Sequence, residues 1–390
     1  MRRTNRKHGW STKVALGLVS CLCTTAFWGC EEEERREVAT FFFNGFNFVW
    51  NLEPHRVDKL GAWIGDIDYD EASETLTADG QLRLQGGDWG GTDSVDYRLY
   101  YGAVNPDLDS AFHKFHHGQT SEIPLTGNIA NNGLDGSTSV TLNLDSIGMD
   151  HLSEFTALVR GFNFSTTQPD PGYTISGVGV EIDNFVHDTV DEQLSFDVWF
   201  KLDAGDVPDR PNQYGPNGTY GYTVRVYWTV IGTTLGAFTE ASDGYTATYT
   251  HCPPAIQPDQ DHAYEIDPSV AEVTIYGEDE LRYTMGFVGW QGFEFTLNDP
   301  IPDCASHDGR YMREITVRNK DIDYDPETGT VNFTTDGYFS NSGGFTYSLR
   351  NNFVGHWVLV QLGGEGEVSH HSRSGGMEDS SETISLSKAY

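Results

Sequence analysis

Two stretches of alternating aspartates carry the residue types and the spacing that could do chemistry. The first is DIDYDEASETLTADG (66–80), and the second is DIDYDPETGTVNFTTDG (321–337). Alternate residues of an extended strand share one face, and carboxylates together with turn carbonyls supply the oxygen ligands that Ca²⁺ prefers. The spacing is therefore compatible with a calcium site in each stretch, and no motif in the chain requires any other cofactor. The six candidate ligands are Asp66, Asp68, Asp70, Asp321, Asp323 and Asp325.

Two other interpretations of these aspartates stay open. A solvated acidic edge would discourage strand-to-strand association, and a carboxylate pair would indicate a glycosidase, although no second partner is visible in the sequence. An EF-hand is excluded, because the sixth loop position lacks glycine and Thr77 and Asn332 stand where the twelfth position requires glutamate.

A third, altered copy of the motif shows which of these residues the backbone needs. Ile64–Leu76 aligns without gaps on Ile182–Leu194 and on Asn319–Val331. In the middle copy the three aspartates become Asn184, Val186 and Asp188. The last aspartate of each copy precedes a tight turn, so Asp70, Asp188 and Asp325 are expected to cap that turn. The first two aspartates of the motif are not required by the repeated backbone, because the middle copy has Asn184 and Val186 at those positions.

The copies belong to longer repeats that predict an all-β fold. The tetrapeptides at 45–48, 161–164 and 292–295 are GFNF, GFNF and GFEF. Strict alternation of apolar residues in 194–202 is typical of a half-buried strand, and a change of parity near Gly65-Asp66 predicts a bulge. The same strand-like segments recur in all three repeats, and the chain contains 43 glycines.

We expect three tandem β-sandwich repeats of jelly-roll or immunoglobulin-like type. Their expected bounds are 38–150, 151–277 and 278–390. No Pro-rich or Gly/Ser linker separates them, so direct packing is expected. A closed arrangement with pseudo-threefold symmetry and a linear rod are the two alternatives.

The first residues predict export. Five Arg/Lys and no acid precede an uncharged, mostly apolar run that ends near residue 29, which is typical of a signal peptide and too short for a bilayer span. The sequence FWGC (27–30) resembles a bacterial lipobox, in which Cys30 after Gly29 would be acylated, although Trp28 stands where a small residue is usual. The resemblance implies a lipid anchor on the outer membrane or cell surface, with an acidic tether over 30–37. Cleavage elsewhere would leave the protein periplasmic or extracellular.

The net charge limits the class of binding partner, and the cysteine content predicts a covalent bond. The net charge of -34 opposes binding to nucleic acid. Cys252 and Cys304 are the two cysteines that remain after the leader and Cys30, and in an exported chain they predict a disulfide. Two free buried thiols are the alternative.

Glycine-flanked aromatic residues indicate where a ligand could bind. Trp89 and Tyr214 are the candidates for stacking on a sugar ring, and core packing is the alternative. His113 and His117 would share a strand face, as zinc ligands do, or serve as polar strand residues. We expect a non-catalytic protein for adhesion, glycan or surface-protein binding, or envelope structure. The alternative is an extracellular polysaccharide-active enzyme.

Overall fold

The all-β prediction is confirmed by the computed structural model. It describes residues 38–50, 57–86, 94–106, 112–128, 133–166, 175–204, 219–248, 262–265, 269–274, 283–298, 312–326, 328–341, 350–364, 366–377 and 381–390. Within these ranges the chain forms antiparallel strands and no helix. Alternation of apolar residues is the cause, because residues such as Phe196, Val198 and Phe200 are buried while their neighbours face outward.

The strands follow one another in three successive sets. The first set is β1 (Thr40–Trp50), β2 (Val57–Asp70), β3 (Thr75–Gly86), β4 (Val95–Asn105), β5 (His113–Gln119), β6 (Ile123–Asn128) and β7 (Gly133–Asn143). The second is β8 (Glu154–Thr166), β9 (Ile175–Asp188), β10 (Gln193–Ala204), β11 (Thr219–Thr233), β12 (Gly236–Thr248), β13 (His262–Glu265) and β14 (Ser269–Thr274). The third is β15 (Tyr283–Asn298), β16 (Met312–Asp325), β17 (Thr330–Asn341), β18 (Arg350–Gly363), β19 (Glu367–Met377) and β20 (Ser381–Ala389).

Strand pairing links each set to the next in a closed cycle. The first strand of a set pairs with the fourth strand of its own set, as in β1–β4, β8–β11 and β15–β18. It also pairs with the second strand of the preceding set, and the last link closes the cycle: β8–β2, β15–β9 and β1–β16. Every set therefore depends on both of the others for its hydrogen-bond ladders.

The later strands of each set pair with the next set in the same cyclic order. β5, β12 and β19 each pair with the fourth strand of the next set, namely β11, β18 and β4. β7, β14 and β20 each pair with the third strand of the next set, namely β10, β17 and β3. Three separate sandwiches in tandem do not describe this pairing, because no set completes its own sheet.

Three equivalent strand groups result. Group 1 has the order β20-β3-β2-β8-β11-β5, group 2 has β7-β10-β9-β15-β18-β12, and group 3 has β14-β17-β16-β1-β4-β19. β6 pairs with both β7 and β11, so groups 1 and 2 form one sheet of 13 strands, while group 3 and β13 form a sheet of 7.

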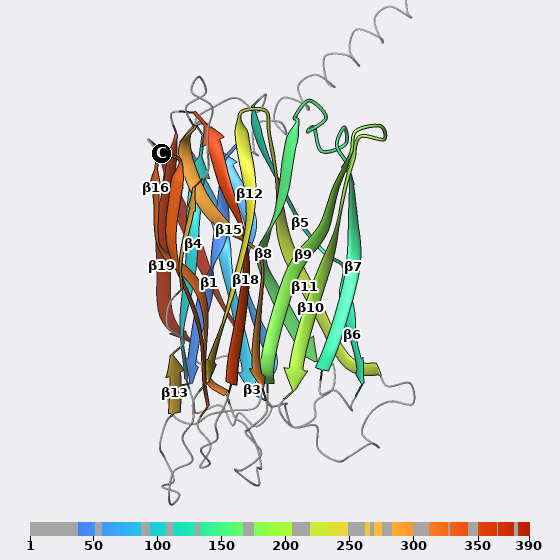
Figure 1. Ribbon diagram of the computed structural model, residues 1–390, viewed down its shortest axis with the longest axis vertical. Coiled ribbons are helices and arrows are strands. Elements are labelled where there is room, and N and C mark those ends of the chain that lie inside the picture. Colours follow the sequence, from blue (N-terminus) through green and yellow to red (C-terminus); the bar gives the residue numbers. More distant parts are fainter. Residues whose placement is uncertain are drawn as a thin grey trace, which may run out of the picture.

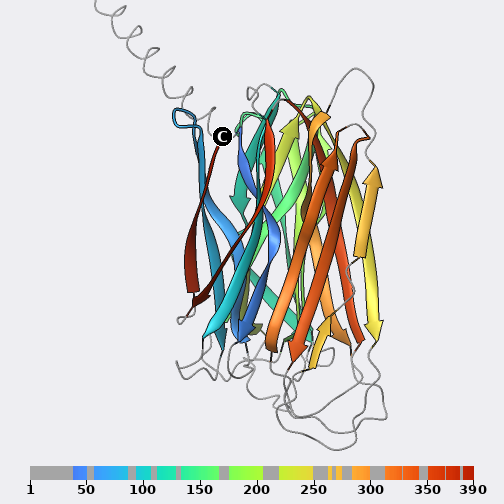
Figure 2. The same ribbon diagram turned by 90° about the vertical axis from the view of Figure 1, so that its left-hand side faces the viewer.

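The strands run along the long axis of the molecule, which gives it two distinct ends (Figures 1 and 2). The tight turns 71–74 and 189–192 lie at one end, together with the start of β1 and the carboxyl terminus. We call this the turn end. The connections that leave β3, β10 and β17 depart from the opposite end.

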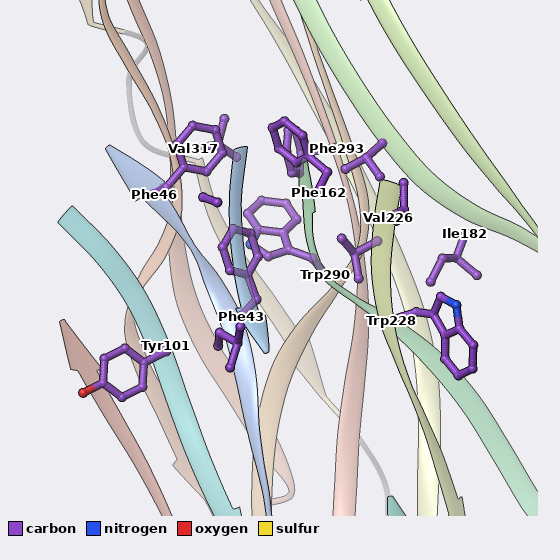
Figure 3. Close-up of a cluster of buried hydrophobic side chains, with 14 of the residues drawn as sticks. Phe43, Phe46, Tyr101, Phe162, Ile182, Val226, Trp228, Trp290, Phe293 and Val317 are labelled. Carbon is purple, nitrogen blue, oxygen red and sulfur yellow. The ribbon is translucent and has the colours of Figure 1, made fainter. Parts of the chain in front are cut away.

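The centre of the molecule is a contact between three phenylalanines, one from each set. Phe46, Phe162 and Phe293 are fully or almost fully buried, and their ring centroids lie 5.9 to 6.5 Å apart. Figure 3 shows them together, with Trp290 beside them. Each is the first phenylalanine of its GFxF sequence, so the repeated motif places one aromatic ring per set at the common centre.

The glycine before each phenylalanine allows this close approach. Gly45 and Gly161 both have φ +129°, a conformation that side chains rarely adopt. A Cβ atom at these positions would collide with the carbonyl oxygen of Val317 or of Ala62 on the neighbouring strand. The register of the first strand shifts here against the fourth, for example between Phe43 and Gly45. The GFxF motif is thus a bulge that turns a large ring inward.

Candidate binding face

The aspartates that opened the sequence analysis mark a second bulge. The predicted bulge near Gly65-Asp66 is confirmed, because the β2–β3 register shifts between Gly65 and Asp68. Asp66, Asn184 and Asp321 have φ of 47°, 53° and 52°. Asp and Asn adopt this left-handed conformation more readily than other side chains. The backbone therefore accounts for Asp66 and Asp321, and for Asn184 in the middle copy.

The last aspartate of each copy caps its turn, as predicted. Asp70 accepts hydrogen bonds from the Ala72 amide at 3.0 Å and from the Ser73 hydroxyl at 2.7 Å. These bonds lower the pKa of the exposed Asp70 carboxyl below its usual value. Asp188 accepts from the amides of Val190 and Asp191 at 2.9 and 3.1 Å.

The third copy of the turn uses a hydroxyl in the same way. Asp325 accepts a hydrogen bond from the Thr328 hydroxyl at 2.9 Å. The side chain of each final aspartate is thus engaged with its own turn.

The structure gives no geometric support to a metal site at these stretches. In the described ranges, no group of three or more His, Cys, Asp and Glu side chains is placed to hold a metal ion. The calcium interpretation of Asp66, Asp68, Asp321 and Asp323 stays a prediction for solution tests.

The histidines on β5 are engaged within the fold. His113 is buried, with Nδ1 2.7 Å from the Thr233 hydroxyl and Nε2 2.8 Å from the Gly363 carbonyl oxygen. His117 Nδ1 lies 3.1 Å from the Thr229 hydroxyl. Both ring nitrogens of His113 are occupied, which disfavours the zinc interpretation.

Five of the predicted functional positions lie outside the described residues. These are Cys30, the Cys252 and Cys304 pair, and the aromatic candidates Trp89 and Tyr214.

The outward side of each GFxF glycine forms a seam between two sets. Because the glycine has no side chain, the residues on the strands to either side of it reach across and touch. Trp63 and Tyr227 stack across Gly161, with ring centroids 5.1 Å apart and planes 6° apart. The seams thus join the second strand of one set to the fourth strand of the next.

The equivalent seams of groups 2 and 3 use different chemistry. In group 2, Glu181 and His356 lie 3.7 Å apart across Gly292. In group 3, the Arg318 guanidinium donates a 2.6 Å hydrogen bond to the Tyr100 hydroxyl across Gly45. One backbone plan therefore carries three chemically distinct outer faces.

The outer face of group 1, which we call face 1, combines aromatic, amide and cationic side chains. Ladder pairing places its residues in three neighbouring rows across the strands. The rows contain Thr383, Gln81, Trp63, Gly161, Tyr227 and Gln119; Ser381, Arg83, Gly61, Asn163 and Arg225; and Gln85, Lys59, Ser165 and Thr223. None of these residues is acidic, although the chain holds 58 acidic and 24 basic residues.

The cations of face 1 are close enough to affect one another. Partial burial lowers the pKa of Lys59, and the neighbouring Arg83 charge lowers it further. Burial likewise lowers the pKa of Arg83, whose Nη1 donates to the Asn163 side-chain oxygen at 3.3 Å. Arg225 lies 3.6 Å from Glu122 at the border of the face. Lys59 and Arg83 thus bring positive charge to the middle of the face, and the neighbouring Asp58 carboxylate partly opposes it at Lys59.

A buried arginine lies beneath this face. Arg160 is the extra residue of the group 1 bulge and is 6% exposed. Its Nη2 donates to the Gly118 carbonyl oxygen at 3.3 Å, and no partner for Nε is found among the described residues. Burial lowers its pKa to about 10, against the opposing effects of Tyr227 and Asp66. The guanidinium thus interacts electrostatically with Tyr227, and the Asp66 carboxylate acts on both groups.

A small pocket lies in the interior of the described part of the chain. A small space between Thr40, Phe42, Arg160 and Phe287 is no larger than a water molecule. Buried phenylalanine and tryptophan side chains fill the rest of the centre.

Sequence reasoning overlooked Trp63, although a signal was present. Leu60, Ala62 and Ile64 share the buried side of β2, so the tryptophan between them must face outward. The glycines at 61 and 65 on the same outward side leave the indole without large neighbours on its own strand. Its partner Tyr227 belongs to another set, and no local pattern could have indicated that contact.

Comparison of the chain with protein-family models, curated proteins and solved structures finds no match. In the described ranges, no helix is long and apolar enough to cross a membrane.

The left-handed backbone at Asp66 predicts a selective response to mutation. Asp66→Val should destabilise the fold by about 1–3 kcal/mol, because a β-branched residue is strained at positive φ. Asp66→Asn should stay within about 0.5 kcal/mol of wild type, as Asn184 does this task in the second set. Asp68→Val is the matched control, since Val186 holds the equivalent position. Urea unfolding measures all three.

Adding calcium distinguishes the backbone explanation of Asp66 from a calcium site. If the backbone alone requires Asp66, excess calcium leaves the unfolding midpoint of wild type and Asp66→Asn equally unchanged beyond salt screening. A calcium-dependent rise in wild type that Asp66→Asn abolishes would establish the metal site instead.

We expect the folded state to lose stability in mild acid because of the lowered pKa of His370. Partial desolvation of the ring and the neighbouring His371 lower its pKa to about 4, and its Nδ1 lies 3.3 Å from the Asn44 side-chain amide nitrogen. The unfolded chain therefore binds a proton more readily, so stability is present above pH ~6.5 and is lost as the pH falls toward about 4. Because the His370 side chain is exposed at the edge strand β19, solvent screening makes its contribution to that loss smaller than the full pKa shift would give.

The variant His370→Gln isolates this contribution, because carboxylates titrate in the same window. The stability of His370→Gln, followed by urea unfolding from pH 7 to pH 4, should fall less steeply than that of wild type. His151→Gln, at an exposed histidine, should keep the wild-type slope. Equal slopes in wild type and His370→Gln would contradict the assignment.

Proposed function

We propose that this protein is an exported, surface-anchored lipoprotein with a non-catalytic binding role. The observation that carries the binding role is face 1, where the partly exposed Trp63 stacks on the buried Tyr227 ring among amides and cations. Aromatic rings beside hydrogen-bonding groups suit the recognition of sugars and of protein surfaces. The buried aromatic side chains at the centre of the molecule favour binding on its outer surface.

The arrangement of the ends is compatible with anchoring. The first described residue directly follows the acidic segment 31–37, and β1 starts at the turn end. A lipid at Cys30 would then tether the turn end to the membrane and hold face 1 lateral to the anchor. Stable anchoring requires more than one acyl chain, which bacterial lipoprotein processing would supply at such a cysteine.

We also propose that the three sets are repeats of one sandwich-like unit with pseudo-threefold symmetry. The support is the recurrence of each inter-set pairing in cyclic order and the equivalent bulges at Asp66, Asn184 and Asp321. In this arrangement each unit borrows strands from its neighbours, which makes the body stiff enough to hold a binding face at a fixed position.

The enzyme alternative has less support in the described residues. Glu181 and Glu294 are neighbouring carboxylates on the outer face of group 2, and burial raises the pKa of Glu181. Both already have a partner: Glu181 lies 3.7 Å from His356, and Glu294 accepts a 2.6 Å hydrogen bond from Lys201. A glycosidase instead holds its two carboxyl groups on opposite sides of the scissile bond.

Two measurements test the proposed function. Cys30→Ala should move the protein from the membrane fraction to the soluble fraction or block its processing, and retention with unchanged mass would contradict the anchor. The fragment 38–390, which contains every described strand, should bind members of a glycan array without altering them. Release of shortened products from a bound glycan would favour the enzyme alternative.

A further inference from the structure

We infer that face 1 is a binding site for an acidic polysaccharide, whose sugar rings contact Trp63 and whose carboxylates pair with Arg83 and Lys59. This inference rests on the proposed binding function and names the ligand class. It starts from the three rows described above, which hold cations and amides but no acid. Although the whole chain has a net charge of -34, this surface is cationic and is therefore suited to an anionic ligand.

The equivalent position in group 2 shows why face 1 differs. Arg83 lies opposite Gly61 in the β3–β2 ladder, as Lys201 lies opposite Gly179 in the β10–β9 ladder. Lys201 donates a 2.6 Å hydrogen bond to Glu294 and is neutralised by it. Arg83 instead contacts the uncharged Asn163, so its charge is not cancelled by that neighbour. The change from glutamate to asparagine at this position leaves positive charge for a ligand.

The spacing of the rows suits a chain of sugars. Rows two residues apart along a strand lie about 7 Å from one another. Trp63, Arg83 and Lys59 belong to three successive rows, so an aromatic contact is followed by two cations at steps comparable to one monosaccharide. A guanidinium binds a carboxylate through two parallel hydrogen bonds, and the amides of Gln81, Gln85 and Asn163 can serve ring hydroxyls.

Acidic groups set the limits of the site. Asp79 lies in the next row toward the turn end, and Glu122 lies beside Arg225. These carboxylates would repel the same ligand. The ligand path is therefore confined to the rows from Trp63 toward the opposite end of the molecule, through Arg83 to Lys59.

The test uses the mature chain with two forms of one polymer. Polygalacturonate carries a carboxylate on each sugar, and its fully methyl-esterified form has the same backbone without the charge. Isothermal titration or affinity electrophoresis should show binding to the acid form that weakens with added NaCl. The esterified form should bind at least about tenfold more weakly, because it lacks the charge-assisted hydrogen bonds.

Matched variants place the site on face 1. Arg83→Gln and Trp63→Ala should each weaken binding about tenfold or more. Lys201→Gln at the equivalent position of group 2 should leave affinity within about twofold, since that lysine already has an acidic partner. Arg83→Lys keeps the charge and should lose less than Arg83→Gln. Unfolding midpoints near wild type show that each variant is folded.

Several results would overturn the inference. Equal affinity for the acid and ester forms, an unchanged Arg83→Gln variant, or a comparable loss in Lys201→Gln would each do so. The absence of binding to either polymer would do so as well, while binding of neutral glycans on the array would leave the proposed function intact. Arg83-dependent binding to anionic lipid vesicles in place of the polymer would assign face 1 to a membrane surface instead.

Discussion

The contact between Phe46, Phe162 and Phe293 is the constraint on which the rest of the structure depends. Each ring reaches the centre because a glycine bulge immediately precedes it and lets the neighbouring strand approach. The three rings bury apolar surface that no single set could cover alone. The first strand that supplies each ring also pairs with two sets, so central packing and cyclic strand pairing stabilise the same arrangement.

The same bulge links the core to the surface. Inward, it directs a phenylalanine to the centre, and outward, it leaves a bare glycine across which two side chains from different sets meet. The core requires the repeated GFxF pattern, whereas the outward pairs Trp63–Tyr227, Glu181–His356 and Arg318–Tyr100 differ in chemistry. The constant interior permits variable exteriors, which is how one of three similar faces can acquire a ligand of its own.

The sequence predicted local features well and long-range features poorly. Alternation identified the strands, the change of parity near Gly65-Asp66 located the bulge, and turn chemistry identified Asp70, Asp188 and Asp325 as caps. Period two shows which side of a strand is buried but not which strand lies beside it. For this reason the repeats were expected to form separate sandwiches, and the contact of Trp63 with a tyrosine of the next set could not be foreseen.

Cyclic closure is tested most directly by changing the order of the sets. A circular permutant that begins at residue 151 and joins residue 390 to residue 38 through a linker of about seven residues should keep every described strand pairing. With that linker the new connection from β20 to β1 matches the length of segment 144–153, which makes the equivalent step from β7 to β8. The permutant should unfold cooperatively close to the wild-type midpoint in calorimetry, whereas fragment 38–277, which leaves β1, β3 and β4 without partners from the third set, should show no cooperative transition. Cooperative unfolding of fragment 38–277 near the wild-type temperature would contradict the account and establish independent domains in a row.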